Sequence, residues 1–500
     1  MKKAFQNVRL IIRDLRFAAS IHPGTLKFII YEGLLEGIMP FISIYTSSLV
    51  IGGITMGVSL NKLLLYAFSA IALTMLALVL KAIVTRIREV RWREMQYKLE
   101  LKIATKMSQI DYGSLEKPET HRLFRSLWEV ENLESGLRRI GNVFGPTIKG
   151  LCGIIISITL AYKAFVTTAN AANGGIIHFI CSPICSIIII GCIILSIVIN
   201  IWASKGVLSA TKIYLDKSRN FTNKLLFYTQ QYVMGYAAAK DIRIYNQVKL
   251  IQNELNSLVD KKNKDNDRCE NQAIAYQGGS LAVIGLLNLL VYVYVAVKAL
   301  AGLFSIGNIV RYIGGILQFT AGLSDFLDGY TQLKANTKFM DSYHEFFALP
   351  NALHTGRLPL TSDKVIKIEF EDVSFCYPGS EDYALRHFSC TLEQGKRYAI
   401  VGKNGSGKTT IVKLLCRLYD PQEGRILLNG IDIRLYDYEQ YLRMFSVVFQ
   451  DFQLFPFSLG QNIAASLNYE NIRVNAAIQQ AGFKTRFEEL ADGSETILYK

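Results

Sequence analysis

A short run of residues, GKNGSGKTT, places glycines, lysines and threonines close together between Gly402 and Thr410. It fits the phosphate-binding pattern G-x-x-x-x-G-K-[ST], with Gly407, Lys408 and Thr409 at its end. The glycines let backbone N–H groups turn towards a phosphate, Lys408 reaches the β- and γ-phosphates, and the Thr409 hydroxyl binds Mg²⁺. We therefore predict a site for a nucleotide and Mg²⁺, whose nucleotide contacts come from Gly402, Lys403, Asn404, Gly405, Ser406, Gly407, Lys408, Thr409 and Thr410.

The segments on either side of this loop predict the elements that hold it. Tyr398 to Val401 are apolar and predict a short buried strand, and TTIVKLLCRLY after the loop predicts an amphipathic helix. The positive N-terminal end of such a helix points at the bound anion. Further strands are predicted in an α/β P-loop domain, at 365–375, 424–433 and 445–450.

The residues before this domain have the composition of a membrane protein. Half of the whole chain is hydrophobic and only 19% is charged, where soluble proteins carry about 25%. Crossing a bilayer takes about twenty mostly apolar helical residues. We predict an all-α transmembrane domain with six helices, near 25–52, 62–85, 140–166, 176–202, 274–303 and 308–333.

The distribution of charge predicts the orientation of these helices. The two long segments between helices two and three, and between helices four and five, are dense in Lys and Arg, which places them and both chain termini in the cytoplasm. Much of the net charge of +14 lies in such segments, so nucleic acid is not an expected partner. We predict that both segments form long helical extensions, and that an amphipathic helix with Phe5, Val8, Ile12 and Leu15 on one face lies on the inner leaflet.

Four carboxylates fall within the predicted membrane helices. Glu32 and Glu36 are four residues apart, and Asp325 and Asp328 are three apart, so each pair shares a helical face. Carboxylates inside a membrane often mark a functional site. They either line a cavity for a cationic or amphipathic substrate, or lie near a membrane boundary or a water-filled vestibule without a selective role.

The soluble part resembles the nucleotide-binding domain of ABC transporters from Val373 to Ile433. The whole chain resembles an exporter-type half-transporter, whose short coupling helices would lie in GSLEKPETHRLF and AAAKDIRIYN. The resemblance implies a multidomain chain with a transmembrane domain at 1–349, a linker at 350–364 and the N-terminal part of an ATP-binding domain at 365–500.

The resemblance also implies roles for two residues outside the loop. Tyr377, in FCYPG, stands where the family stacks an aromatic ring on adenine. Gln450, in VVFQD, stands where a glutamine contacts Mg²⁺ and the attacking water, so that Lys408 and Gln450 are the expected catalytic residues and Thr409 and Gln450 the expected metal contacts. The segment after it, FQLFPFSLGQNI, would receive the coupling helices.

The resemblance implies a membrane partner and a transported substrate. Two half-transporter chains, identical or related, would pair in the cytoplasmic membrane and use ATP to export a peptide, a lipid or a hydrophobic small molecule. A membrane-anchored P-loop kinase acting on lipid is disfavoured, because Tyr377, the loop and Gln450 stand in the order of the ABC family.

The residues after Gln450 depart from the family pattern. An apolar run ending in Asp-Glu, a Ser-Gly-Gly signature and a later histidine are expected there, and the printed chain to Lys500 contains none of them. The segment from Ser458 to Asn462 comes too early and lacks paired glycines. We expect an incomplete ATP-binding domain that binds nucleotide but turns it over poorly alone. The alternative is a non-hydrolysing regulator or a degenerate subunit of a heterodimer.

Overall fold

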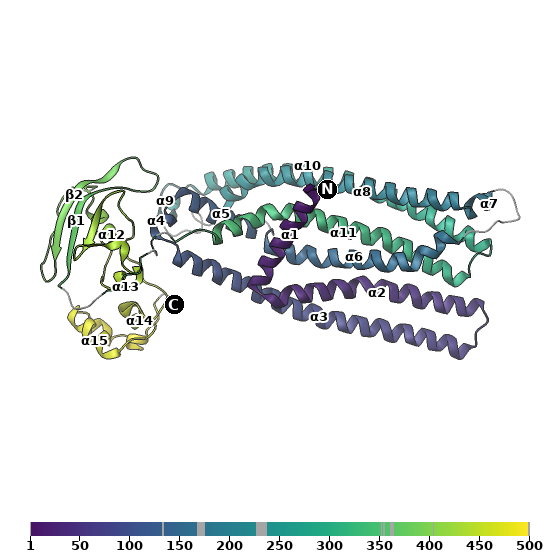
Figure 1. Cartoon of the computed structure of the whole chain (residues 1–500), viewed down its shortest axis with the longest axis horizontal. Helices are drawn as coiled ribbons and strands as arrows, with labels where there is room; N and C mark the ends of the chain where they lie inside the picture. Colours follow the sequence, from purple (N-terminus) through teal and green to yellow (C-terminus); the bar gives the residue numbers. More distant parts are fainter. Residues whose placement is uncertain are drawn as a thin grey trace. The chain divides into compact units, whose positions relative to one another are not determined.

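The computed structural model describes residues 2–132, 135–167, 176–226, 238–351, 353, 356–360, 365–403 and 405–498. The chain divides into two compact units, residues 1–351 and 352–500, each with hydrophobic clusters of its own (Figure 1). Asn404, seven of the fifteen residues of the predicted linker and the middle of the second long basic segment lie outside the described residues.

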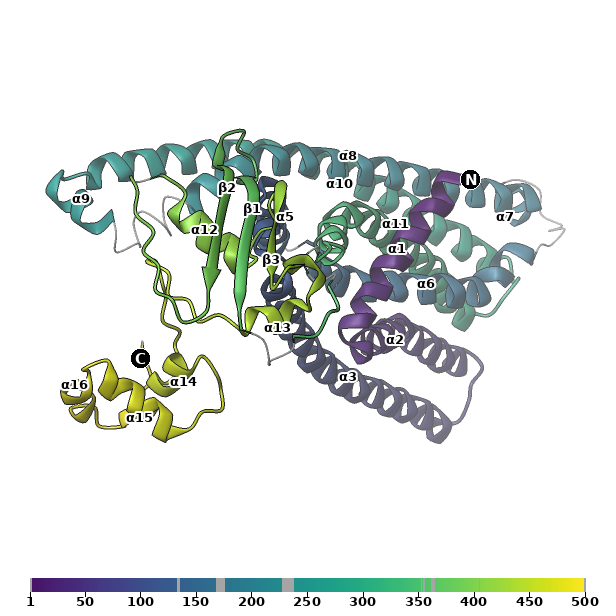
Figure 2. The same ribbon diagram turned by 60° about the vertical axis from the view of Figure 1, so that its left-hand side comes forward.

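The first unit is made of helices, which run side by side in Figures 1 and 2. Their bounds are α1 Lys2–Ile21, α2 Pro23–Thr55, α3 Leu60–Gln109, α4 Tyr112–Leu115, α5 Pro118–Asn132, α6 Leu137–Val166, α7 Ile176–Cys181, α8 Pro183–Leu226, α9 Ala239–Ile244, α10 Val248–Leu300 and α11 Ile306–Phe347.

Five of these helices are long and apolar enough to cross a membrane: α2, α3, α6, α10 and, in α8, Pro183–Val207. They coincide with five of the six predicted stretches. The fourth stretch is divided, because Pro183 begins a new helix after α7. The helices α3 and α10 have 50 and 53 residues, well beyond the roughly 20 that a bilayer needs, so the predicted long extensions are confirmed.

The sixth predicted stretch lies in α11, which is helical but is not among the apolar helices of the described chain. Its sequence carries Arg311, Gln318 and two aspartates. The helix packs against α2, α6, α8 and α10, so its polar side chains contact protein on several sides. A membrane span at 308–333 stays a prediction.

The helices α6 and α11 lie in backbone contact. A Cβ atom on Gly150 would come within 2.4 Å of the Gly322 carbonyl oxygen, and one on Gly329 within 2.0 Å of the Thr147 hydroxyl. Small residues at such crossings allow close packing of helices in membranes. Further along the same pair, the Asn336 side chain bonds both the N–H and the carbonyl of Gly136 at 2.8 Å, which sets the antiparallel register.

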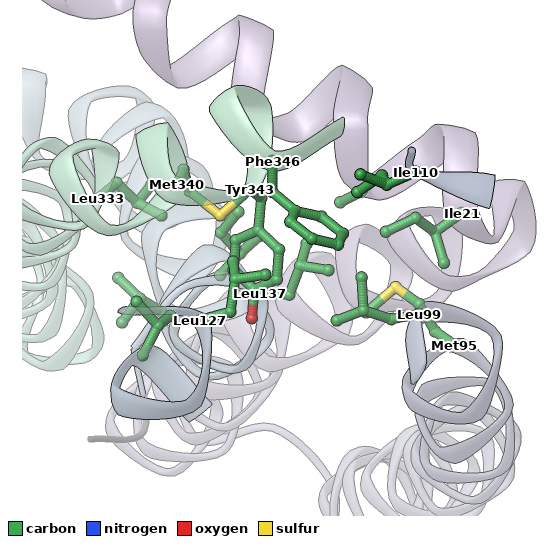
Figure 3. Close-up of a cluster of buried hydrophobic side chains, with 14 residues drawn as sticks. Ile21, Met95, Leu99, Ile110, Leu127, Leu137, Leu333, Met340, Tyr343 and Phe346 are labelled. Carbon is green, nitrogen blue, oxygen red and sulfur yellow. The ribbon is translucent and has the colours of Figure 1, made fainter. Parts of the chain in front are cut away.

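A cluster of buried side chains joins α1, α3, α5, α6 and α11 (Figure 3). It includes Ile21, Met95, Leu99, Ile110, Leu127, Leu137, Leu333, Met340, Tyr343 and Phe346. The cluster forms where the helices extend past their most apolar parts, and it fixes α1 to the bundle.

The helix α1 is also held by charge. An Arg13 nitrogen lies 2.7 Å from Asp341, and the Asp14 carboxylate lies 3.0 Å from His344. Burial raises the pKa of the Asp14 carboxyl above its usual range, although Arg13 and His344 favour its ionised form. Phe5, Val8 and Ile12 are exposed, whereas Leu15, which was predicted to share their face, packs into the cluster, and the position of α1 on the inner leaflet stays a prediction.

The second unit contains a four-stranded antiparallel sheet of order β2-β1-β3-β4. The strands are β1 Lys367–Cys376, β2 Tyr383–Glu393, β3 Glu423–Leu428 and β4 Ile431–Asp432, and the helices and 3-10 turns are α12 Lys408–Leu415, η3 Ile433–Leu435, α13 Tyr438–Leu442, α14 Leu459–Ala464, α15 Asn471–Gln480, α16 Lys484–Glu488 and η4 Gly493–Glu495. The strands predicted at 365–375 and 424–433 are confirmed, the second being divided at Asn429 and Gly430, which have positive φ.

Two predicted strands are wrong. Neither 398–401 nor 445–450 forms a strand, and Val401 and Val448 are 91% and 84% exposed. A short apolar strand is stabilised by hydrogen-bonded neighbours on each side. In the described part of the unit, the sheet pairs only β1 to β4 with one another.

The glycine contact between α6 and α11 can be tested with matched alanines. Gly150→Ala should lower the Tm of the detergent-purified chain by several degrees, because the new methyl group has no space and overpacking costs about 1–3 kcal/mol. Gly191→Ala in α8, where no atom lies within 4 Å of the added Cβ, should leave Tm unchanged or raise it slightly. Equal effects of the two substitutions, measured by thermal unfolding, would contradict this packing.

Candidate functional site

The loop before α12 has the backbone of a phosphate cradle. Gly405 and Gly407 have φ of +84° and +86°, and Gly407 caps the N-terminus of α12. The first N–H groups of a helix have no partner within the helix, so they are available to an anion. Lys408 Nζ lies 2.9 Å from the Gly402 carbonyl oxygen and 2.7 Å from that of Lys403, so its ammonium lies over the loop.

Glycine is required at position 407 by both conformation and space. A Cβ there would lie 2.7 Å from the Ala384 carbonyl oxygen and 2.7 Å from a methyl group of Leu385. Both contacts belong to β2, so the loop lies directly against the sheet. These residues fit the phosphate chain of a nucleotide.

The Tyr377 side chain contacts α12, the helix that follows the loop. Its hydroxyl lies 2.9 Å from that of the buried Thr410. Its ring meets Phe375 and Tyr419 edge-on, with centroids 5.0 and 5.5 Å away, and the Lys413 ammonium lies 5.2 Å from its centroid. Stacking on adenine stays a prediction, and a base on the face that Lys413 covers would have to displace that side chain.

The two residues predicted to contact Mg²⁺, Thr409 and Gln450, are both exposed. Thr409 is exposed at the start of α12, and Gln450 is exposed and makes no hydrogen bond with another described residue. Within the described ranges no group of three or more His, Cys, Asp or Glu side chains could hold a metal ion. Mg²⁺ would therefore depend on Thr409 and on the phosphates of the nucleotide, and the role of Gln450 stays a prediction.

The far end of α12 is fixed by contacts that the sequence did not reveal. Arg417 is 1% exposed, and its guanidinium lies 3.1 Å from Asp420 and donates to the Ile433 carbonyl. The buried Tyr441 hydroxyl donates to the Leu415 carbonyl at 2.7 Å, and burial raises its pKa, so it stays protonated. Asp420 is close to Arg417 in the sequence, but no local pattern predicts the bonds of Arg417 to Ile433 and of Tyr441 to Leu415, because these partners are 16 and 26 residues apart.

The four carboxylates that were predicted to lie within membrane helices all have partners. Glu32 lies 2.6 Å from Arg88, Glu36 lies 2.8 Å from Lys81, and Asp325 lies 2.9 Å from Lys149. Asp328 instead accepts a hydrogen bond from Ser204 at 2.5 Å. Three of the charges are thus offset within the protein, while Asp328 has no cation beside it in the described chain.

Two of these carboxylates line cavities. Glu36, with Lys81 and Lys149, lines one of about 400 Å³ between α2, α3 and α6. Asp328 lines another of about 370 Å³ between α6, α8, α10 and α11. The first cavity carries paired charges, and the second carries polar side chains from all four helices.

Comparison with known proteins agrees with this arrangement. Residues 385–496 match the family model described as ABC transporter. The subtilin transport ATP-binding protein SpaT of Bacillus subtilis is 33% identical over 174 residues, 35% of this chain and 28% of that protein. The ATP-dependent lipid A-core flippase of Haemophilus ducreyi is 42% identical over 133 residues, 26% of this chain and 23% of that protein. The chain thus spans about a quarter of the length of these curated relatives.

The fold of the whole chain is also known. The structure of a bacterial Atm1-family ABC exporter with ATP bound is similar with a TM-score of 0.72 over 95% of this chain and 79% of that one, at 18% identity. A helical membrane domain with apolar spans is therefore fused to an ABC-type nucleotide-binding segment, and the predicted fold class is confirmed. The chain therefore contains a segment, 385–496, that is similar to the ABC transporter family, and it has the fold of an ABC exporter, with five helices long and apolar enough to cross a membrane among its described residues.

A pair of glycine substitutions tests whether the loop conformation is needed for nucleotide. Gly407→Ala should weaken ATP binding at least tenfold, because the methyl group must displace β2 or the loop. Gly395→Ala carries the same left-handed strain, at φ +80°, but meets no atom within 4 Å, so it should leave ATP affinity unchanged. Titration with a fluorescent ATP analogue compares them, and equal affinities would contradict the assignment.

Proposed function

We propose that the chain is one half of an ATP-driven exporter that works as a dimer with a second half-transporter chain, identical or related. The observation that carries this proposal is the fusion of a phosphate-binding loop at 402–410 to a helical unit with five apolar, membrane-length helices. The matches to ABC exporters support it.

In this proposal the loop N–H groups and Lys408 hold the phosphates, Thr409 and Gln450 contact Mg²⁺, and Tyr377 contacts adenine. ATP, when bound, supplies the free energy that favours one conformation of the helices over the other. Transport by alternating access requires only that ATP binds the two conformations with different affinities. The substrate is then released on the opposite side of the membrane.

The proposal includes an orientation. The basic segments around α4, α5 and α9 lie in the cytoplasm, together with both termini, and the membrane is the cytoplasmic membrane of the cell. The substrate is a peptide, a lipid or a hydrophobic small molecule, and the relatives named for subtilin and for lipid A-core support the first two classes.

A second candidate is a nucleotide-binding subunit that regulates a transporter or pairs with an active partner. It is favoured by the described site, where Gln450 is exposed and makes no hydrogen bond with another described residue. Hydrolysis of a nucleotide needs a side chain that orients the attacking water. The two candidates share the same nucleotide site and differ in turnover.

Lys408→Ala tests the nucleotide site shared by both candidates. Loss of the ammonium should weaken ATP binding roughly tenfold or more, since charge-assisted contacts to phosphate are strong. Lys403→Ala, in the same loop, should have a smaller effect, because only the backbone carbonyl of Lys403 contacts Lys408. Unchanged affinity in Lys408→Ala would overturn the assignment of the loop.

ATP turnover tests the expectation that this chain binds nucleotide but hydrolyses it poorly alone. We expect the purified 500-residue chain to bind ATP and to hydrolyse it at a rate close to that of the Lys408→Ala variant. Phosphate release that is well above background and is abolished by Lys408→Ala would contradict this expectation and would show that the chain alone has a complete catalytic site.

A further inference from the structure

The two threonines that follow Lys408 lie in different surroundings. Thr409 is exposed at the start of α12, where it can reach a phosphate or Mg²⁺. Thr410 is only 4% exposed, and its hydroxyl lies 2.9 Å from the hydroxyl of Tyr377. The sequence predicts both threonines as nucleotide contacts. Because so little of Thr410 is accessible, its hydroxyl is better placed to bond Tyr377 than to bond a phosphate.

The backbone on each side of Tyr377 is fixed by hydrogen bonds. The Gln422 side-chain amide accepts from the Cys376 N–H at 3.0 Å and donates to the Cys376 carbonyl at 2.8 Å. A turn follows, in which the Ser380 N–H donates to the Tyr377 carbonyl at 3.0 Å. These bonds determine where the Tyr377 side chain begins. They do not determine the direction of its ring, which depends on side-chain contacts.

Three kinds of contact hold the ring itself. Its plane lies at 80° to that of the buried Phe375 and at 87° to that of the buried Tyr419. The Lys413 ammonium lies 5.2 Å from the Tyr377 centroid, within the range of a cation–π contact. These contacts act on the body of the ring, whereas the bond to Thr410 holds the hydroxyl at its tip. Thr410 and Lys413 are three residues apart and so lie on one face of α12.

The first turn of α12 is thus connected to both parts of the candidate nucleotide site. The phosphate loop ends at Gly407, and Lys408 begins the helix. Thr410, in the same turn, bonds Tyr377, the ring expected to stack on the base. The phosphates and the base of a nucleotide are joined through one ribose, so the distance between their two sites has to match the ligand. A bond between the helix and the ring sets that distance before a nucleotide arrives, which lowers the entropic cost of binding.

We propose that Thr410 is a positioning residue for the nucleotide base. Its hydroxyl holds Tyr377 against the first turn of α12, so that the ring offers its stacking surface at a set distance from the phosphate loop. The Thr410 side chain acts on the ligand through Tyr377 and not by direct contact. This role rests on the proposed function, because it requires Tyr377 to contact the base. A ligand that has phosphates but no base should not depend on the bond between the two hydroxyls.

The test compares ATP with inorganic tripolyphosphate, which has the phosphate chain and no base. Each competes with a fluorescent ATP analogue for the purified full chain in Mg²⁺, and the ratio of the two affinities reports the contribution of the base. Thr410→Val keeps the side-chain shape without the hydroxyl, and Tyr377→Phe keeps the ring without the hydroxyl. Either variant should lower the ratio by about three- to tenfold, the usual value of one hydrogen bond. The double variant should lower it no further, because both substitutions remove the same bond.

Matched variants separate this role from a general loss of structure. Thr410→Ser keeps the hydroxyl and should keep the affinity ratio of the unaltered chain. Tyr436→Phe removes another tyrosine hydroxyl from the same unit, one that donates to the Leu428 carbonyl at 3.2 Å, and it should leave the ratio unchanged. If Thr410→Val does not fold, Tyr377→Phe removes the same bond from the other side and gives the same measurement.

The outcomes distinguish the role of Thr410 from the nucleotide site as a whole. An unchanged ratio in both single variants, or additive losses in the double variant, would overturn the positioning role. Equal weakening of ATP and tripolyphosphate in Thr410→Val would also overturn it, because the hydroxyl would then act on the phosphates. If the unaltered chain binds neither ligand, or Lys408→Ala binds both as before, the proposed function itself is overturned. Lys408-dependent binding of ATP with an unchanged ratio would overturn the role of Thr410 alone.

Discussion

The backbone contact between α6 and α11 determines the geometry of the helical unit. Gly150 and Gly322 have no room for side chains at this contact, and the Asn336–Gly136 hydrogen bonds fix the register of the two helices. Helices packed this closely cannot slide without breaking both features. The pairing of Lys149 with Asp325 follows from this register.

Charge among the apolar helices is tolerated because side chains of neighbouring helices neutralise it. A carboxylate in a membrane helix is retained at low cost when a cation from a neighbouring helix reaches it, as Arg88 reaches Glu32 and Lys81 reaches Glu36. Asp328 is the exception, because it accepts a hydrogen bond from Ser204 and has no cation beside it among the described residues.

In the second unit, the phosphate-binding loop is held in place by the strand and the helix that it contacts. Gly407 lies against β2, and the Tyr377 hydroxyl contacts Thr410 in the first turn of α12. At the other end, Arg417 and Tyr441 fix the chain after α12. The loop N–H groups are therefore oriented before a phosphate arrives, which lowers the entropic cost of binding.

The sequence by itself determined the features that are encoded by neighbouring residues. The phosphate loop, the predicted membrane helices and their long extensions were inferred from local spacing and hydrophobicity, and the described structure has the loop, the extensions and five of the six helices as apolar spans. The strands expected at 398–401 and 445–450 did not form, because a strand is decided by its partners rather than by its own residues. Only the tertiary structure decided which cation pairs with each membrane carboxylate, that Tyr377 bonds Thr410, and that Arg139 and Asp328 line one cavity. These groups are far apart along the chain, and their contacts depend on how closely and in what register whole helices pack.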